Sequence, residues 1–346
     1  MNVLIRTDAS VQIGTGHVMR CLTIAREMRK RGHQITFAMR NLQGHLAGVV
    51  KKQGFHVEML HYEGDFQFEK DVMKTRQLFL RQDYDICVVD HYWIDEKWEK
   101  MIHPFVKRLI VIDDLANRSH DCEILLDQNV VSNYEHRYDH LVPKYCKKLL
   151  GPKYLILREE FTRIRKKIIP RKGDVRNLLI FMGGSDPTGE TLKVMKAFEN
   201  FDASFYHVDV VVGQANPDRE AVRTYCEKFG FAYHCQIDYL ASLMAKADFS
   251  IGAGGSTTWE RCYVGLPSSS TIVADNQVEA TKMAARLGVV INLGWHEKVT
   301  SQTYEKLLNQ IIEQKETIQK MSMNGLQLTE NPDGPNPWVN QMLEMW

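Results

Sequence analysis

Short apolar segments that recur between amphipathic stretches constrain the fold of this chain more than any other feature. In the first part of the chain they lie at residues 2–6, 34–39, 86–89, 109–112 and 124–126. Strands have this composition when helices cover both faces of their sheet, because neither face then meets water. We therefore expect an α/β fold with a parallel sheet, in which a helix over about residues 17–31 follows the first strand.

The alternation breaks near the middle of the chain and then starts again. Gly151 and Pro152 precede a charged helical stretch, and Pro170 and Gly173 follow it. New apolar strands are expected at 177–182, 207–212, 249–251 and 270–273. The pattern predicts two Rossmann-like domains with parallel sheets that face each other across a cleft. We assign the first domain to 1–155, a crossover to 156–172, the second domain to 173–325, and a tail that packs back on the first domain to 326–346.

Composition narrows the possible functions. The 346 residues include 44 Lys and Arg against 43 Asp and Glu, so a net charge of +1 gives no signature of nucleic-acid or anionic-membrane binding. No segment approaches the roughly 18 consecutive apolar residues of a membrane-spanning helix. The seven cysteines form no CxxC pair, which is typical of a reducing compartment. We expect a cytoplasmic monomer.

The most specific local motif is the run from Gly252 to Glu260, GAGGSTTWE, which follows an expected strand and opens a helix. Glycines let a backbone approach a ligand, and a helix N-terminus offers N–H groups to a phosphate. We therefore expect the motif to bind an anion rather than to form only a tight turn, and its candidate residues are Gly255, Ser256 and Thr257. Glu260 either complements the helix dipole or accepts hydrogen bonds from ribose hydroxyls.

Two further groups follow strands in the second half of the chain. Gly184 and Ser185 belong to a glycine turn after 177–182. Asn276 and Gln277 follow 270–273, and their amides are suited to sugar hydroxyl or acetamido groups.

In the first half, the segment from Gly14 to Arg20, GTGHVMR, opens the first helix. It is not a dinucleotide fingerprint, because the third glycine is missing near Arg20, so we expect no cofactor. Gly16 and Arg20 are candidate substrate contacts. At a helix start the dipole disfavours an imidazolium, so His17 either accepts a proton as a neutral base or only caps the turn.

Polar residues also end the other strands of the first half. Asp90 and Tyr92 follow 86–89, the pair at 113–114 follows 109–112, and Asn129 follows 124–126. The acidic pair has no third ligand at a recognisable spacing, so we expect a structural role and no metal. Because all these groups follow expected parallel strands, we expect them to meet in one cleft.

Together the blocks resemble one family, the UDP-2,4-diacetamido-2,4,6-trideoxy-β-L-altropyranose hydrolases of pseudaminic acid synthesis, with the related spore-coat polysaccharide proteins. The resemblance runs from residue 1 to about 325 and is carried by 6–10, 14–20, 90–92, 112–114, 182–186 and 254–260. The last block is shared with peptidoglycan N-acetylglucosaminyltransferases and other glycosyltransferases of the two-Rossmann-domain (GT-B) type.

The resemblance implies a metal-independent hydrolase that binds a UDP-sugar and cleaves its C1–O bond with inversion. It implies that His17 is the general base, that Tyr92 lies close by, and that Asn276 contacts the ligand. Trp93 stands where the family has a small residue, so the identity of the sugar is left open. Two alternatives remain: a UDP-sugar glycosyltransferase, and a non-catalytic nucleotide-sugar sensor that has no use for His17.

Overall fold

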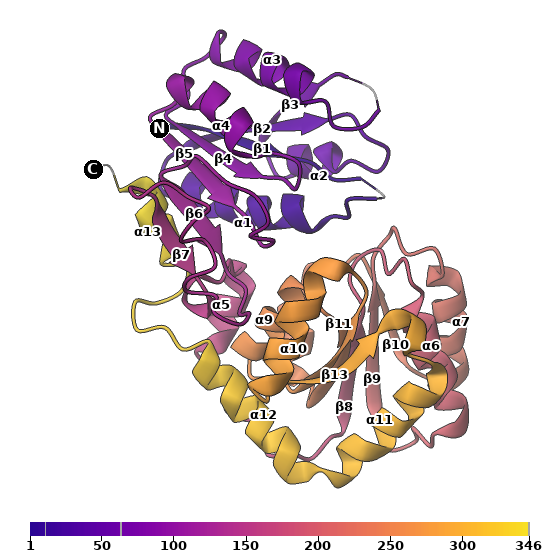
Figure 1. Cartoon of the computed structure of the whole chain (residues 1–346). Coiled ribbons are helices and arrows are strands. Elements are labelled where there is room, and N and C mark those ends of the chain that lie inside the picture. The colour runs from indigo at the N-terminus through magenta and orange to yellow at the C-terminus, as the bar shows by residue number, and fades with distance from the viewer. Residues whose placement is uncertain (11, 63, 345–346) are drawn as a thin grey trace. The chain divides into compact units, whose positions relative to one another are not determined.

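A computed structural model describes residues 1–10, 12–62 and 64–344 (Figure 1). The chain forms two compact units. The N-terminal unit contains Met1–Asn129, Asn133–Ile156 and Asp333–Trp346, and the C-terminal unit contains Val130–Ser132 and Leu157–Pro332. The chain therefore leaves the N-terminal unit, builds the C-terminal unit, and returns.

The N-terminal unit is built on a seven-stranded parallel sheet with the order β3-β2-β1-β4-β5-β6-β7. The strands are β1 (Asn2–Thr7), β2 (Gln34–Arg40), β3 (His56–Leu60), β4 (Ile86–Asp90), β5 (Arg108–Ile112), β6 (Ile124–Asp127) and β7 (Lys147–Leu150). The helices are α1 (Gly16–Lys30), α2 (Ala47–Lys52), α3 (Phe68–Phe79), α4 (Glu96–Ile102) and α13 (Trp338–Leu343), with 3-10 turns at His103–Phe105 and Pro152–Tyr154.

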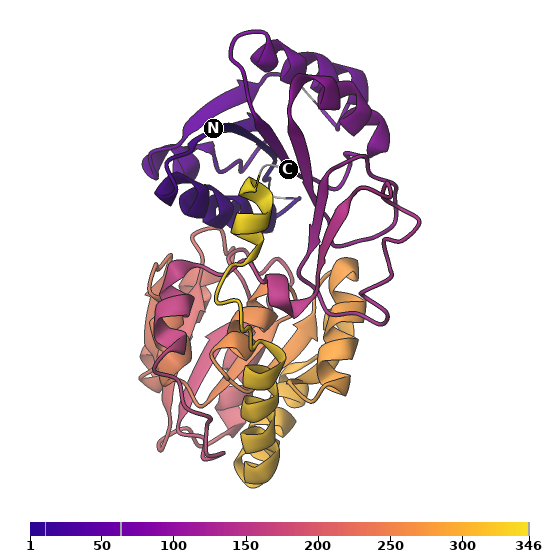
Figure 2. The same cartoon turned by 90° about the vertical axis from the view of Figure 1, so that its left-hand side faces the viewer.

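Two apolar layers cover the two faces of this sheet. One layer joins Val3 and Ile5 to side chains of α1, α2 and α13, and the other joins Leu4 to side chains of α3 and α4. Neighbouring β1 residues point to opposite faces, so a strand buried on both sides needs the continuous apolar run seen in the sequence. Figure 2 shows α13, drawn in yellow, beside the indigo elements of the same unit.

The C-terminal unit has a six-stranded parallel sheet with the order β10-β9-β8-β11-β12-β13. The strands are β8 (Asn177–Phe181), β9 (His207–Val212), β10 (Ala232–Cys235), β11 (Phe249–Ala253), β12 (Ser268–Ile272) and β13 (Val290–Trp295). The helices are α5 (Glu159–Arg165), α6 (Glu190–Ala197), α7 (Arg219–Phe229), α8 (Leu240–Lys246), α9 (Ser256–Tyr263), α10 (Val278–Arg286), α11 (Ser301–Glu313) and α12 (Lys315–Leu328), with 3-10 turns at Phe198–Asn200, Asp275–Gln277 and His296–Lys298.

Both sheets have the Rossmann strand order. Successive strands are added on one side of β1 and then on the other, so the order reverses between β1 and β4, and in the second sheet it reverses between β8 and β11. The predicted fold of two Rossmann-like domains with parallel sheets is confirmed. Ligands of such sheets bind beyond the carboxyl ends of the strands at the point of reversal. These two strand pairs are therefore where candidate sites are sought.

Some details differ from the prediction. β12 begins at Ser268 and ends at Ile272, so the expected strand at 270–273 was placed too late. The strands β3, β7, β10 and β13 were not predicted at all.

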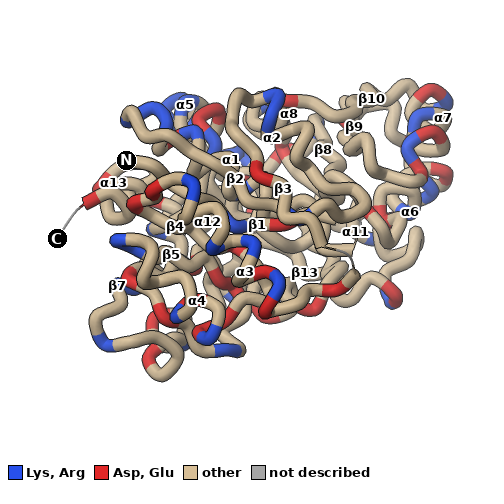
Figure 3. The backbone as a smooth tube through the Cα atoms, turned by 90° about the horizontal axis from the view of Figure 1, so that it is seen from above, with Lys and Arg blue, Asp and Glu red and all other residues tan. Residues whose placement is uncertain are grey.

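The surface carries charges of both signs. Blue and red segments are interspersed along α7 in Figure 3, where Arg223 pairs with Glu227 one turn later. Within the described residues, no helix is both long enough and apolar enough to cross a membrane.

Candidate functional site

The first candidate site lies where β1 and β4 diverge. Thr7 and Asp90 are paired in register at the ends of these strands, and His17 is the second residue of α1, the helix that follows β1. The His17 Nδ1 lies 2.5 Å from Asp90 Oδ1, and both side chains are buried. An ionised carboxylate can only accept, so Nδ1 carries the shared hydrogen and donates it. In a neutral ring this leaves the lone pair on Nε2.

Arg20, one helical turn after His17, fixes Asp90 from the other side. Its Nε donates to Asp90 Oδ2 at 2.8 Å and its Nη2 to Oδ1 at 2.7 Å. Burial raises the pKa of Asp90, but Arg20 and His17 lower it more, so this pKa lies well below its usual range. Asp90 and Arg20 bond to each other and orient His17. Their contact with the substrate, suggested by the sequence, stays a prediction.

Tyr92 packs against the imidazole of His17. Their ring centres are 4.3 Å apart and the planes meet at 81°, an edge-to-face arrangement. Between Asp90 and Tyr92, His91 turns away, and its Nε2 lies 3.0 Å from Asp8 Oδ2. Trp93 leaves 52% of its surface exposed. His17 and Tyr92 therefore lie together, as the sequence predicted. Asp90, the last residue of β4, anchors His17 to the sheet through its hydrogen bond.

The buried polar block after β1 has a different role. Arg6 donates to Asp8 at 2.7 Å and to Asp71 at 2.5 Å, and Arg40 donates to Asp8 at 2.6 Å. These four side chains are almost fully buried and neutralise each other. The block that carried part of the family resemblance thus tethers the ends of β1 and β2.

The acidic residues that end β5 and β6 are held by protein groups. Asp113 pairs with Arg118 at 2.7 Å and accepts from the Tyr138 hydroxyl at 3.0 Å. Asp127 accepts from Arg137 at 2.8 Å and from the backbone N–H of residue 129 at 2.9 Å. No group of His, Cys, Asp or Glu side chains in the described ranges is arranged to hold a metal ion.

The second candidate site lies where β8 and β11 diverge. Gly255 precedes α9 with a φ of 99°, a conformation that side chains other than glycine rarely adopt. Among the described residues, no side chain forms a cap hydrogen bond to this helix start. A Cβ added at Gly255 would meet only the Gln277 amide nitrogen, at 3.6 Å. The backbone N–H groups at the start of α9, near Ser256 and Thr257, therefore receive no side-chain cap from the described part of the chain.

Two loops at other strand ends of this sheet are held by close contacts. A Cβ on Gly213, at the end of β9, would clash with the carbonyl of Gly184, so the loop that holds Gly184 and Ser185 packs directly on that strand end. The Gln277 side-chain oxygen accepts from the Val273 N–H at 3.1 Å. Gln277 therefore braces the loop that carries the exposed Asn276. Gly213 was missed in the sequence, where it looks like an ordinary turn glycine.

Glu260 does not stand alone in the first turns of α9. Its Oε1 accepts from Arg158 Nε at 3.2 Å and from Nη2 at 3.1 Å. Burial lowers the pKa of Arg158, but Glu260 and Glu160 raise it more. Arg158 was not recognised, because it lies in the segment that the sequence assigned to the crossover.

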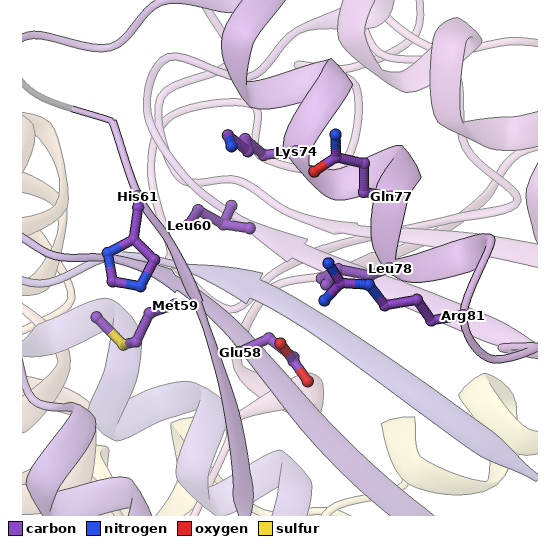
Figure 4. Close-up of a pocket in the computed structure, with 8 residues that line it drawn as sticks. All are labelled: Glu58, Met59, Leu60, His61, Lys74, Gln77, Leu78 and Arg81. Atoms are coloured by element: carbon purple, nitrogen blue, oxygen red, sulfur yellow. The ribbon is translucent and has the colours of Figure 1, made fainter.

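The structure also contains a pocket lined by other residues. A cavity of about 400 Å³ lies along β3 and α3, and Figure 4 shows the side chains that line it. Its lining consists of Glu58, Met59, Leu60, His61, Lys74, Gln77, Leu78 and Arg81. None of the residues predicted from the sequence lines it, so it does not define the candidate sites.

The architecture, with two Rossmann-like domains in one chain, is that of the GT-B glycosyltransferase fold. It superimposes on MurG of Acinetobacter baumannii with a TM-score of 0.68 and 13% identity over 99% of both chains. A UDP-GlcNAc 2-epimerase of Neisseria meningitidis gives a TM-score of 0.56 with 12% identity over 99% of this chain and 98% of that one. At these identities the likeness establishes the fold alone.

Curated relatives place the chain more narrowly. It is 35% identical over 155 residues to the spore coat polysaccharide biosynthesis protein SpsG of Bacillus subtilis, covering 44% of this chain and 45% of that protein. It is 26% identical over 227 residues to the UDP-2,4-diacetamido-2,4,6-trideoxy-β-L-altropyranose hydrolase of Campylobacter jejuni, covering 66% and 75%. Homologues of this chain thus include both groups named by the sequence resemblance.

The match to an uncharacterised protein of Methanocaldococcus jannaschii is 28% identical over 275 residues, 77% of this chain. The chain spans about half the length of that protein and of SpsG, 54% and 45%. No family model matches the sequence.

Proposed function

We propose that this chain is a cytoplasmic nucleotide-sugar hydrolase. It releases UDP from UDP-2,4-diacetamido-2,4,6-trideoxy-β-L-altropyranose or a close relative, in the synthesis of pseudaminic acid or of a surface or spore-coat polysaccharide. The homologous hydrolase and SpsG support this substrate class. The closeness of Asp90 to His17 supports base-assisted displacement of UDP most directly, because it prepares an imidazole to accept a proton. The homologous hydrolase supports water as the attacking group.

In the proposed reaction, His17 Nε2 accepts a proton from water while the water oxygen attacks C1 of the sugar. The bond between C1 and the diphosphate oxygen breaks, and its electron pair leaves with UDP. Attack from the face opposite UDP inverts C1. Asp90 holds the Nδ1–H tautomer and stabilises the imidazolium that forms, as carboxylates do in other His–Asp pairs.

The C-terminal unit is proposed to hold the nucleotide. The diphosphate would bind Gly255, Ser256 and Thr257, where N–H groups and the helix dipole stabilise negative charge as UDP leaves. Glu260, positioned by Arg158, would accept hydrogen bonds from the ribose hydroxyls. UDP is a good leaving group, so the reaction depends less on a general acid than ordinary glycoside hydrolysis does.

The deciding experiment follows UDP release from candidate UDP-sugars without any acceptor. A hydrolase yields UDP and free sugar in equal amounts, and proton NMR of the first product shows the inverted anomer. The GT-B-like fold supports a glycosyltransferase as the second candidate. UDP release that requires an added acceptor would establish the transferase, and UDP-sugar binding without turnover would establish the sensor.

His17→Asn tests the base. Because general bases typically contribute ~10²–10⁴-fold, kcat should fall by about that factor while UDP affinity stays near parental. His56→Asn is the matched control. His56 is exposed and is the first residue of β3, so it lies at the amino end of its strand, whereas the candidate site lies at the carboxyl ends of the strands. Parental turnover of the His17 variant would contradict the assignment.

A further inference from the structure

Arg261, the residue after Glu260 in α9, is an arginine with a fully buried side chain and only neutral acceptors. Its Nη2 donates to Ala253 O at 3.0 Å, to Thr258 Oγ1 at 3.2 Å and to Ser270 Oγ at 3.0 Å. Its Nε donates to Ser268 Oγ at 3.0 Å, and its Nη1 to Thr257 Oγ1 at 3.4 Å. No ion pair to Arg261 occurs within the described residues, since the adjacent Glu260 bonds to Arg158 instead.

The sequence around Arg261 accommodates this buried charge at a cost. Serines occupy positions 268 and 270 of the central strand β12, where a parallel sheet usually has apolar residues. A Cβ at Gly252 would lie 2.5 Å from Arg261 Nη1, so this motif glycine makes room for the guanidinium. Burial lowers the pKa of Arg261 to about 10, and the group is still charged at neutral pH. A buried cation without a counter-ion is unfavourable, unless a ligand supplies the negative charge.

The position of the guanidinium indicates which ligand that is. Ala253 ends β11, and Thr257 and Thr258 belong to the first turn of α9. The cation therefore lies beneath the turn proposed to bind the diphosphate, and its charge adds to that of the helix N-terminus. Thr257 is only partly buried, and its hydroxyl accepts from Nη1. A hydroxyl that accepts from a cation becomes a stronger donor toward a third group.

We propose that Arg261 is a positioning residue of a diphosphate-binding site. It acts without touching the ligand, by placing a buried charge under the turn and by polarising the Thr257 hydroxyl toward a phosphate oxygen. The inference rests on the proposed function and adds to it the residue that gives this turn its preference for a nucleoside diphosphate over an uncharged nucleoside.

The test compares binding of UDP and uridine by titration calorimetry and NMR. Arg261→Met should weaken UDP binding about 10-fold or more, the scale of the charge-assisted hydrogen bond from the Thr257 hydroxyl to a phosphate oxygen. Uridine affinity should change less than about twofold. Arg261→Lys should restore part of the loss. Arg223→Met, which removes an exposed arginine of α7, controls for net charge. Equal losses for both ligands would show a merely structural role, and unchanged UDP affinity would overturn the inference.

A second variant keeps the test decisive if Arg261→Met does not fold. Thr257→Val should weaken UDP binding severalfold and leave uridine binding unchanged, whereas the exposed Thr224→Val in α7 should change neither. Parental UDP affinity in Thr257→Val would overturn the inference. If the parent hydrolyses UDP-sugars and the variants bind UDP normally, only this inference fails. If the parent does not bind UDP, the proposed function fails first and the inference with it.

Discussion

At the scale of single residues, chemistry in this chain depends on partners that are distant in sequence. Asp90 is 73 positions from His17, and only the pairing of β1 with β4 brings the two together. The histidine alone is compatible with a base or with a cap. Its hydrogen bond to a buried, ionised carboxylate fixes the tautomer and favours the base.

Gly16 offers a test in which stability and activity separate. It is the first residue of α1, and an added Cβ would meet no heavy atom within 4 Å. Gly16→Ala should therefore keep the free energy of unfolding or raise it by roughly 0.5–1 kcal/mol, as measured in urea. If the substrate approaches this backbone as proposed, kcat/KM for UDP release should fall. A variant with parental kcat/KM would show that Gly16 is not a substrate contact.

Asp127 predicts a specific dependence of stability on pH. Burial raises its pKa to about 7, from about 4 in an unfolded chain, so the folded state binds this proton more tightly. The contribution of this proton to the free energy of unfolding is fully present below pH 4 and is lost as the pH rises to 7. The free energy of unfolding changes by roughly 2–4 kcal/mol over this range. Asp127→Asn removes this titration. The Tm of the variant minus the Tm of the parent should therefore be higher at pH 8 than at pH 5. An equal Tm difference at both pH values would contradict the shift.

At the scale of elements, the sequence predicted the central strands and missed the edges. The unpredicted strands β3, β7, β10 and β13 are the outermost strands of the two sheets. An edge strand has one neighbour and less cover, so it tolerates residues such as Lys147 or His234 that interrupt an apolar run. Most of the inner strands are covered on both faces and have longer apolar runs, so they are easier to recognise.

The candidate sites divide in a similar way. Residues placed at strand ends, such as His17 and Gly255, were predictable because the carboxyl edge of a parallel sheet gathers them. Their supporting partners were not. Arg158 lies in a segment without strand character, and Arg261 follows an acidic residue in a helix, a pattern typical of a solvated face. Only the packing of β11, β12 and α9 buries the Arg261 guanidinium.

The acidic pair that ends β5 gives an element-scale prediction about metal. Asp113 is held by Arg118 and Tyr138, and Asp114 lies 3.5 Å from Arg20 Nη1. Because protein groups already engage these carboxylates, UDP release should keep its full rate after exhaustive chelation. The measurement is kcat before and after treatment with EDTA, followed by addition of Mg²⁺ or Mn²⁺. A rate that falls and is restored by either ion would assign the pair to a metal.

At the scale of the whole molecule, the chain closes its first unit with its last segment. Trp338 of α13 is fully buried in the core of the N-terminal unit, and its Nε1 donates to Leu155 O at 3.0 Å. Val339 and Met342 are buried beside it. The first unit is therefore complete only after the second has been synthesised, and its stability depends on residues about 180 positions from their partners.

This organisation predicts that Trp338→Ala acts on one unit. Loss of a fully buried tryptophan should cost about 3–5 kcal/mol in the N-terminal unit, seen as a lower Tm and earlier proteolysis of that unit. UDP affinity should persist at low temperature, because the residues proposed to bind UDP belong to the C-terminal unit with its own core. Trp93→Ala, which removes a half-exposed tryptophan, is the control and should leave the Tm nearly unchanged. Loss of UDP affinity in Trp338→Ala at a temperature where the C-terminal unit remains folded would show that the nucleotide site depends on the first unit as well.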